Sequence, residues 1–216
     1  LPKVIYAKKN YKNFVIILPY KLKIDFVISS LKKLKVKFFF LKNENNYFFK
    51  NLIYIGSLYP SGNPRKKIIY DLKKKFHSKI KNSKRIYISR NKSERRKITN
   101  EANLIQILKN YRFKTVYSEK MSLHKQIKIF SSAKYIIGLH GAGLTNSLWM
   151  KKKSYLIEIK PERDLYLNCY FNLANLLGLN YHYIICKKKN IFKTSKNSNY
   201  EVDINKIKKK LSKIIK

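Results

Sequence analysis

Apolar segments of strand length alternate with amphipathic helical segments from Arg85 to Ile185, and this alternation constrains the fold most. The pattern predicts strands at 85–89, 113–117, 135–139, 155–159 and 181–185, and helices at 99–110, 122–133 and 165–177. Strands that alternate with helices of about a dozen residues form right-handed βαβ units around a parallel sheet. The predicted fold class is therefore α/β, a Rossmann-like, doubly wound parallel sheet that binds ligands at the carboxyl ends of its strands.

The pattern before residue 85 is less regular. It predicts strands at 14–18, 36–41 and 52–55 and helices at 24–34 and 65–77, with a turn segment, YPSGNP, at Tyr59–Pro64. Thr99 is the expected N-cap of the helix at 99–110, and Gly178 the left-handed C-cap of the helix at 165–177. We expect three parts: a smaller, partial N-terminal α/β lobe over 1–80, a Rossmann-like lobe over 81–190, and a polar loop with a C-terminal helix (203–215) over 191–216.

A glycine-rich turn follows the strand predicted at 135–139. The chain has six glycines, and Gly138, Gly141 and Gly143 lie together in YIIGLHGAGLTNSLW (Tyr135–Trp149). A strand, a glycine turn and a helix start form an anion site from backbone N–H groups and the helix dipole. A histidine beside such a turn can contact a phosphate or transfer a proton, so His140 is the candidate catalytic residue, with a structural histidine as the alternative.

The turn matches none of three common glycine motifs. The Walker loop needs Lys and Ser/Thr after its last glycine, and here Leu144 and Thr145 follow Gly143. A dinucleotide motif would follow the first strand of the unit, and a nucleophile elbow needs a central serine. Two interpretations remain, a tight connection without a ligand and a ligand site. The polar residues Thr145 and Asn146 favour the site.

Arginine is scarce, since the chain has seven arginines against 43 lysines. Arg85, Arg90, Arg95 and Arg96 nevertheless lie within a short stretch at and after the first regular strand. The planar guanidinium fork suits phosphate or carboxylate, which indicates an anion contact, and a solvated basic loop is the alternative. Arg90 lies nearest the strand end and is the strongest candidate.

The few acidic residues include one further candidate for ligand binding, and their spacing argues against a metal site. Glu158 lies near the end of the fourth regular strand, where a carboxylate can accept hydrogen bonds from ribose hydroxyls, or simply face solvent. The aspartates are isolated and form no DxD pair, so a site for a hard metal ion is not expected. They are Asp25, Asp71, Asp164 and Asp203.

The formal net charge of +39 invites a nucleic-acid interpretation. However, the lysines are spread along the whole chain, and readers of base sequence usually rely on arginine. We expect background charge with some affinity for anionic surfaces, and no specific nucleic acid; a basic nucleic-acid-binding α/β module is the alternative function. No apolar run is long enough for a transmembrane helix, and Cys169 and Cys186 are expected to be reduced.

In order and spacing, four segments resemble glycosyltransferase family 61, also called the DUF563 family. They are SRNKSERRKITNE (Ser89–Glu101), Gln126 within a helix, IIGLHGAGLTNSLW (Ile136–Trp149) and YLIEI (Tyr155–Ile159). The resemblance covers about residues 85–185 and is strongest over HGAGLTN. The family includes bacterial capsular-polysaccharide enzymes and eukaryotic O-GlcNAc and xylosyl transferases.

The resemblance implies a GT-B-like enzyme with two Rossmann-like lobes. It would move a sugar from a nucleotide sugar to a glycan or lipid-linked acceptor in cell-surface polysaccharide biosynthesis, by inversion and with no metal or other cofactor. The donor would lie on or near Arg90, Arg95, Arg96, Gly141, Ala142, Gly143, Leu144, Thr145, Asn146 and Glu158. A member that binds the sugar nucleotide without turnover is an alternative.

Two further expectations concern extent and location. An N-terminal part of about 80 residues is short for an acceptor lobe, so the sequence is either truncated or that of a minimal member. The expected location is the cytoplasm, with peripheral contact of the basic surface with anionic lipid of the inner membrane.

Overall fold

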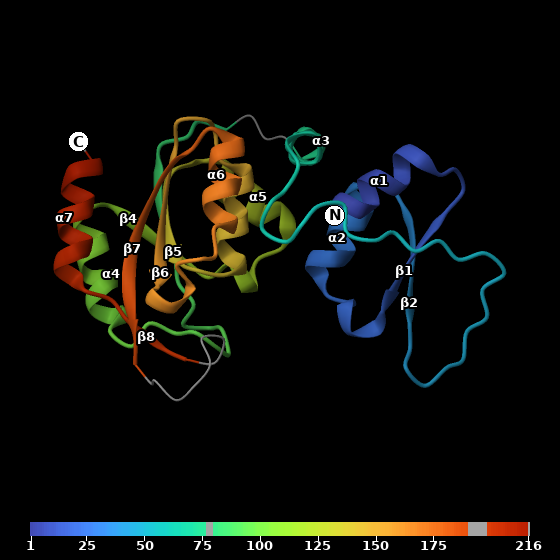
Figure 1. Cartoon of the computed structure of the whole chain (residues 1–216), viewed down its shortest axis with the longest axis horizontal. Helices are drawn as coiled ribbons and strands as arrows, with labels where there is room; N and C mark the ends of the chain where they lie inside the picture. The colour runs from blue at the N-terminus through green and yellow to red at the C-terminus, as the bar shows by residue number, and fades with distance from the viewer. Residues whose placement is uncertain (77–79, 190–197, 216) are drawn as a thin grey trace.

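Parallel strands make up most of the central sheet, as the alternating pattern predicts. The computed structural model describes residues 1–76, 80–189 and 198–215. Within these residues the strand order is β4-β3-β5-β6-β7-β8 (Figure 1), and only the last pair is antiparallel. The strands are β3 (Lys84–Ile88), β4 (Phe113–Val116), β5 (Ala133–Leu139), β6 (Tyr155–Pro161), β7 (Asn180–Lys188) and β8 (Tyr200–Glu201).

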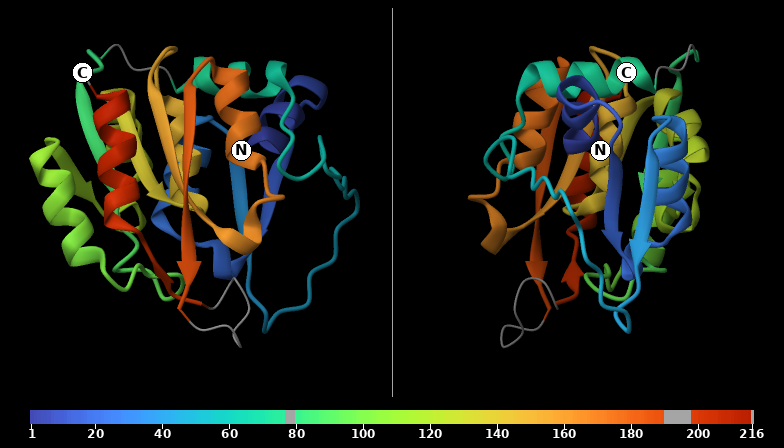
Figure 2. Two further views of the ribbon diagram at one scale, coloured as in Figure 1. Left: turned by 60° about the vertical axis from the view of Figure 1, so that its left-hand side comes forward. Right: turned by 90° about the vertical axis from the view of Figure 1, so that its right-hand side faces the viewer.

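Helices cover both faces of this sheet (Figures 1 and 2). One face carries α4 (Glu101–Asn110) and α7 (Ile204–Ile214), and the other carries α5 (Leu123–Ser131), α6 (Cys169–Leu177) and the 3-10 segment η3 (Ala142–Trp149). Along β3, Ile86 and Ile88 pack on the α5 side and Tyr87 packs on the α4 side, because successive strand side chains point to opposite faces. The α/β class with a parallel sheet buried on both faces is confirmed.

The N-terminal residues form a smaller α/β unit beside α5 (Figure 1). Its two strands pair in parallel, and its elements are α1 (Pro2–Asn10), β1 (Val15–Pro19), η1 (Tyr20–Leu22), α2 (Asp25–Lys33), β2 (Lys37–Leu41) and α3 (Lys66–Lys75). Leu31 of α2 and Leu72 of α3 belong to the same buried cluster as Leu123 and Phe130 of α5. The two parts therefore share one continuous apolar core.

Two predicted elements differ from the structure. The prediction of a strand at 52–55 is wrong: these residues form no strand, and the side chains of Leu52 and Ile53 are exposed. An apolar run becomes a strand only where a neighbour pairs with its backbone groups. The helix predicted at 165–177 begins at Cys169, after η4 (Glu162–Asp164) and a loop in which the Leu165 carbonyl accepts a hydrogen bond from Lys160 (3.0 Å).

Of the two predicted helix caps, one is confirmed and the other is wrong. Gly178 is the left-handed C-cap that its position predicts, with φ 64°. Thr99 is not the N-cap of α4, because its hydroxyl donates to the Tyr200 carbonyl (3.2 Å) and Asn100 takes the cap position. The helix α1, the short strand β8 and the 3-10 helix η2 (Ser118–Lys120) are not predicted. The end of the predicted helix at His77 and most of the predicted C-terminal loop lie outside the described residues.

The core on the α4 side allows a test of the fold. Leu104 is fully buried between α4 and the sheet, so Leu104→Ala should lower the free energy of unfolding by about 2–5 kcal/mol, through lost burial and the cavity left behind. Urea denaturation followed by circular dichroism measures the change. Leu52→Ala is the matched control, because that side chain is 67% exposed, and it should change stability by about 0.5 kcal/mol or less. Equal effects of the two variants would contradict this packing.

Candidate functional site

The carboxyl ends of β3 and β5 form the switch point of the sheet. These strands are neighbours, but the chain continues from β3 to the outer strand β4 on one side, and from β5 to β6 on the other. Ligands of open α/β sheets bind at such a point. The arginine-rich loop follows β3 and the glycine turn follows β5, so the structure brings the two sequence signals together.

Two of the predicted arginines pack against the glycine turn. A Cβ atom added to Gly141 would lie 2.5 Å from Arg90 Nη1 and 3.4 Å from Arg96 Nη2. The Arg90 side chain is fixed from behind by its own loop, since Nε donates to the Arg96 carbonyl (3.3 Å) and Nη2 donates to Ser93 Oγ (3.0 Å). Glycine at 141 therefore leaves the space that the Arg90 guanidinium occupies.

This pair of cations forms no ion pair among the described residues, although the Glu119 carboxylate acts electrostatically on Arg90 from a longer distance. None of the ion pairs in that part of the chain includes Arg90 or Arg96. Burial, followed by the neighbouring charge of Arg96, lowers the pKa of the Arg90 guanidinium. Two adjacent guanidinium groups in a half-buried position favour a multivalent anion such as a phosphate.

The third predicted arginine, Arg95, takes a different position. Its side chain is exposed, and its carbonyl oxygen accepts a hydrogen bond from Arg90 Nη2 (3.2 Å). No contact of its side chain with the glycine turn is found in residues 1–76, 80–189 and 198–215. Arg95 thus supports Arg90 through its backbone.

The residues of the turn divide into exposed and structural positions. Ala142 and Thr145 are exposed and Gly143 is half-buried. Leu144, which sequence analysis placed at the donor, is fully buried, and its N–H donates to the Gly141 carbonyl (2.9 Å), so this amide is not free. Asn146 is also engaged within the turn, donating to the Gly143 carbonyl (3.2 Å) and accepting from Trp149 Nε1 (3.2 Å).

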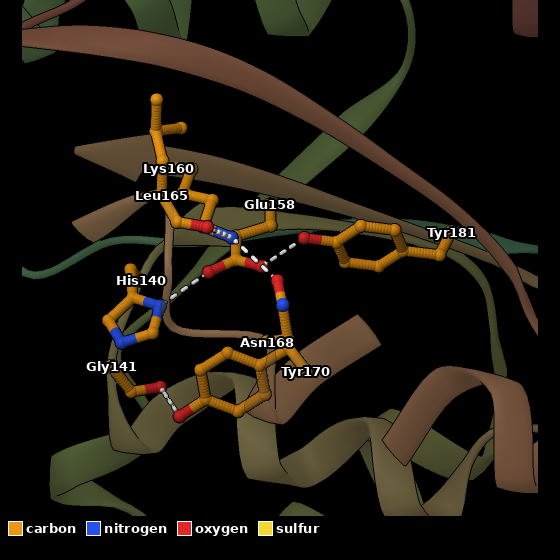
Figure 3. A network of polar contacts seen from close by, with 8 residues as sticks. All are labelled: His140, Gly141, Glu158, Lys160, Leu165, Asn168, Tyr170 and Tyr181. Atoms are coloured by element: carbon orange, nitrogen blue, oxygen red, sulfur yellow. Dashed lines mark hydrogen bonds and ion pairs between the residues drawn. The ribbon is translucent and has the colours of Figure 1, made fainter. Parts of the chain in front are cut away.

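His140, Glu158 and Tyr181 form a buried hydrogen-bonded chain (Figure 3). His140 Nδ1 bonds to Glu158 Oε1, and the Tyr181 hydroxyl donates to Glu158 Oε2. The Glu158 side chain is completely buried. Burial, with the hydrogen bond and charge of Glu158, raises the pKa of the Tyr181 hydroxyl above its usual range. The other ring nitrogen of His140, Nε2, faces away from Glu158, on the side of Gly141 (Figure 3).

The surroundings of Glu158 differ from the sequence expectation. A carboxylate that contacts ribose must reach the surface of the site, but both oxygens of Glu158 are bound by protein groups in the interior. In this structure Glu158 therefore contacts His140 and holds no free oxygen for a ligand.

Two tyrosines that sequence analysis missed complete the site. The Tyr170 hydroxyl donates to the Gly141 carbonyl (2.5 Å), and its ring packs edge-on against His140 with ring centroids 5.2 Å apart. Burial is the main cause that raises the pKa of Tyr170 to about 12. The chain has 17 tyrosines, so the sequence alone could not single out Tyr170 or Tyr181 as site residues. Only the strand register and the start of α6 bring them to this place.

The N-terminal part touches the same region. The turn segment at Tyr59–Pro64 reaches α6, where Asn172 Nδ2 donates to the Gly62 carbonyl (3.0 Å). Gly62 has φ 78°, and a Cβ atom there would lie 3.1 Å from Cys169 Cβ. Both cysteines are free thiols, as expected. A large open groove of about 1370 Å³ lies between α1, β1 and residues 49–59 rather than at the switch point.

No metal cluster accompanies these residues in the part of the chain that the structure describes. Groups of three or more His, Cys, Asp or Glu side chains that could hold an ion are absent from those residues. Positive charge at the switch point comes from Arg90 and Arg96.

Comparison with known proteins gives one family. The family model described as Glycosyltransferase 61 matches residues 15–157, which is more than half of the chain. The chain is 30% identical over 116 residues to an EGF domain-specific O-linked N-acetylglucosamine transferase of Gallus gallus, covering 49% of this chain and 20% of that protein. A Drosophila melanogaster protein of the same name is 33% identical over 98 residues, covering 44% of this chain and 18% of its own length.

A second kind of relative carries a different name. Protein O-linked-mannose beta-1,4-N-acetylglucosaminyltransferase 2 of Takifugu rubripes is 34% identical over 99 residues, covering 43% of this chain and 17% of its own length. The chain thus matches about a fifth of the length of these curated relatives.

Gly141 allows a test of the site's geometry. Its φ of 152° with ψ of 176° is a backbone region open essentially to glycine, and a Cβ atom would displace the fixed Arg90 guanidinium. Gly141→Ala should therefore lower the free energy of unfolding by about 1–3 kcal/mol in urea denaturation. Gly56→Ala is the control, because a Cβ atom there meets nothing within 4 Å. Equal stability of the two variants would contradict the close packing at Gly141.

Proposed function

The chain belongs to glycosyltransferase family 61, and we propose that it transfers a sugar from a nucleotide-sugar donor to a glycan or lipid-linked acceptor in cell-surface polysaccharide biosynthesis. The observation that carries the proposal is the pair of guanidinium groups, Arg90 and Arg96, against the glycine turn at the switch point. The diphosphate of the donor is the anion that this pair would bind. The backbone of Ala142 and Gly143 and the side chain of Thr145 would lie along the same ligand.

Leaving-group stabilisation is the main chemical task that we assign to this pair. When the sugar–phosphate bond breaks, negative charge develops on the diphosphate, and fixed cations nearby lower the barrier. Arg90 is held in place by its loop before any ligand arrives, so little reorganisation is needed. We propose that these guanidinium groups neutralise the charge without a metal ion, in an inverting displacement with His140 as the group that takes up the acceptor proton.

The arrangement of lobes follows from the same proposal. We propose a GT-B-like organisation in which the sheet β4-β3-β5-β6-β7 holds the donor and the N-terminal unit lies on the acceptor side. Contact between Gly62 and Asn172 supports this, because it links the N-terminal unit to α6, the helix that carries Tyr170. The relatives named for N-acetylglucosamine transfer make UDP-N-acetylglucosamine the first donor to test.

Titration calorimetry with UDP tests the donor site. Wild-type protein should bind UDP, and Arg90→Ala or Arg96→Ala should each weaken binding about tenfold to a hundredfold, because a charge-assisted hydrogen bond contributes about 1.5–3 kcal/mol. Arg112→Ala is the matched control, since this exposed arginine precedes β4 at the opposite edge of the sheet. Absence of nucleotide binding by the folded wild type would overturn the proposal. Tight RNA binding that persists in Arg90→Ala would favour the nucleic-acid module.

We further propose peripheral contact with the anionic inner membrane from its cytoplasmic side, through residues 48–54. Phe48, Leu52, Ile53 and Tyr54 are between 56% and 96% exposed, and Lys50 lies among them. Apolar side chains with neighbouring lysines suit the interface of an anionic bilayer. Leu52, Ile53 and Tyr54 also border the open groove, whose apolar lining suits the chain of a lipid-linked acceptor. Among the described residues, no helix has the length and apolar character needed to cross a membrane.

Vesicle co-sedimentation tests this contact. The protein should sediment with vesicles that contain phosphatidylglycerol and stay in solution with pure phosphatidylcholine, because the lysines need an anionic partner. The double variant Leu52→Ser/Ile53→Ser should lose several-fold in bound fraction at equal salt, while Leu165→Ser, which removes an exposed leucine after η4, should bind like wild type. Unchanged binding of the double variant would show that residues 48–54 are not the contact.

A further inference from the structure

Glu158 and Tyr181 have surroundings that donor binding does not explain. The carboxylate is fully buried on β6, and a buried carboxylate is stable only when its oxygens are hydrogen-bonded. One oxygen is bound by His140 at the end of β5 and the other by Tyr181 on β7. Three adjacent strands therefore contribute one residue each to a single chain of hydrogen bonds (Figure 3).

The donor–acceptor direction of these hydrogen bonds determines which tautomer His140 adopts. An ionised carboxylate accepts hydrogen bonds only, so the proton between the two groups lies on His140 Nδ1. In the neutral imidazole, Nε2 then carries the lone pair. Nε2 faces the side of Gly141, away from Glu158, and no hydrogen bond from Nε2 is found within residues 1–76, 80–189 and 198–215. This nitrogen is thus able to accept a proton at the switch point.

We propose that Glu158 and Tyr181 are positioning residues that hold His140 as the Nδ1–H tautomer, with Nε2 ready to take the proton of the acceptor hydroxyl. The inference rests on the proposed glycosyl transfer. In that step the acceptor oxygen forms a bond to the anomeric carbon while the bond from that carbon to the diphosphate oxygen breaks. The electron pair of the broken bond leaves with the diphosphate. The hydroxyl proton moves to Nε2, and the resulting imidazolium is stabilised by Glu158 through Nδ1–H.

Tyr181 has a distinct part in this arrangement. Its hydroxyl occupies the oxygen of Glu158 that His140 does not use, so the carboxylate plane is fixed on both sides. Without this donor, a buried oxygen would be left unpaired and the carboxylate could turn away from His140. The Tyr170 ring packs edge-on against the imidazole of His140 and so restrains it from another direction. The ring is thus held by a hydrogen bond at Nδ1 and by packing on one side.

Several charged or titratable groups surround this chain of hydrogen bonds. Their positions are known from their contacts or electrostatic interactions with the site. They are Arg90 and Arg96 after β3, Lys160 on β6, Cys169 and Tyr170 on α6, and Tyr181 and Cys186 on β7. Burial is the main cause that raises the pKa values of Cys169 and Tyr170, so both stay protonated at neutral pH.

Kinetics of three variants test the positioning role. Tyr181→Phe should lower kcat about tenfold, and Glu158→Gln about a hundredfold, with UDP affinity within about twofold of wild type, because neither residue contacts the donor. Tyr183→Phe is the matched control, because this half-exposed tyrosine lies two residues along on β7. Wild-type kcat in Tyr181→Phe, with UDP binding intact, would overturn the inference.

A readout that needs no turnover separates this inference from the proposed function. In ¹⁵N-histidine NMR at a pH where His140 is neutral, wild type should show the Nδ1–H tautomer for the signal that His140→Gln removes. In Glu158→Gln the same signal should shift toward the Nε2–H tautomer. An Nε2–H tautomer in wild type would overturn the inference whether or not the protein binds nucleotides. Loss of UDP binding with the expected tautomer would instead count against the proposed function alone. Thermal melts of each variant confirm that it is folded.

Discussion

The burial of one carboxylate governs the arrangement of the site. Glu158 lies in the middle of the sheet with no exposed surface, and an unpaired charge in that position would be strongly unfavourable. Its two oxygens must therefore be satisfied from neighbouring strands, which requires His140 at the end of β5 and Tyr181 on β7 to lie where they do. The register of three strands, the orientation of the histidine ring and the approach of α6 through Tyr170 are all consistent with this requirement.

Positive charge beside the neighbouring strand β3 lacks the pairing that the buried carboxylate has. The loop after β3 holds two guanidinium groups against the glycine turn, and neither forms an ion pair with a carboxylate in the described residues. Hydrogen bonds from Arg90 to the Arg96 and Arg95 carbonyls hold the cation in position without reducing its charge. A bound anion would supply the missing counter-charge. The site thus combines a satisfied buried anion, a histidine it orients, and an unsatisfied cationic pair within one edge of the sheet.

Much of the fold was predictable because its determinants are local. Strands β3 to β7 and helices α4 and α5 follow from apolar periodicity over a few residues, and Gly178 ends α6 because the left-handed region favours glycine. Residues 52–55 have the composition of a strand but no strand to pair with, so composition alone gave the wrong element. The start of α6 was also missed, because the contact between Lys160 and the Leu165 carbonyl depends on packing rather than on helix propensity.

The sequence by itself determined which kinds of groups lie at the carboxyl edge of the sheet. Scarce arginines follow one strand and clustered glycines follow another, and parallel strands end at the same edge. The strand order that makes β3 and β5 neighbours was decided by the tertiary structure. Tertiary structure alone decided what each group does there. His140, Glu158 and Tyr181 are 18 and 23 residues apart in sequence, and only strand register turns their side chains toward one another. Because of that register, Glu158 contacts His140 rather than a ligand. The register also places Tyr181 against Glu158, which could not be predicted from a chain with so many tyrosines.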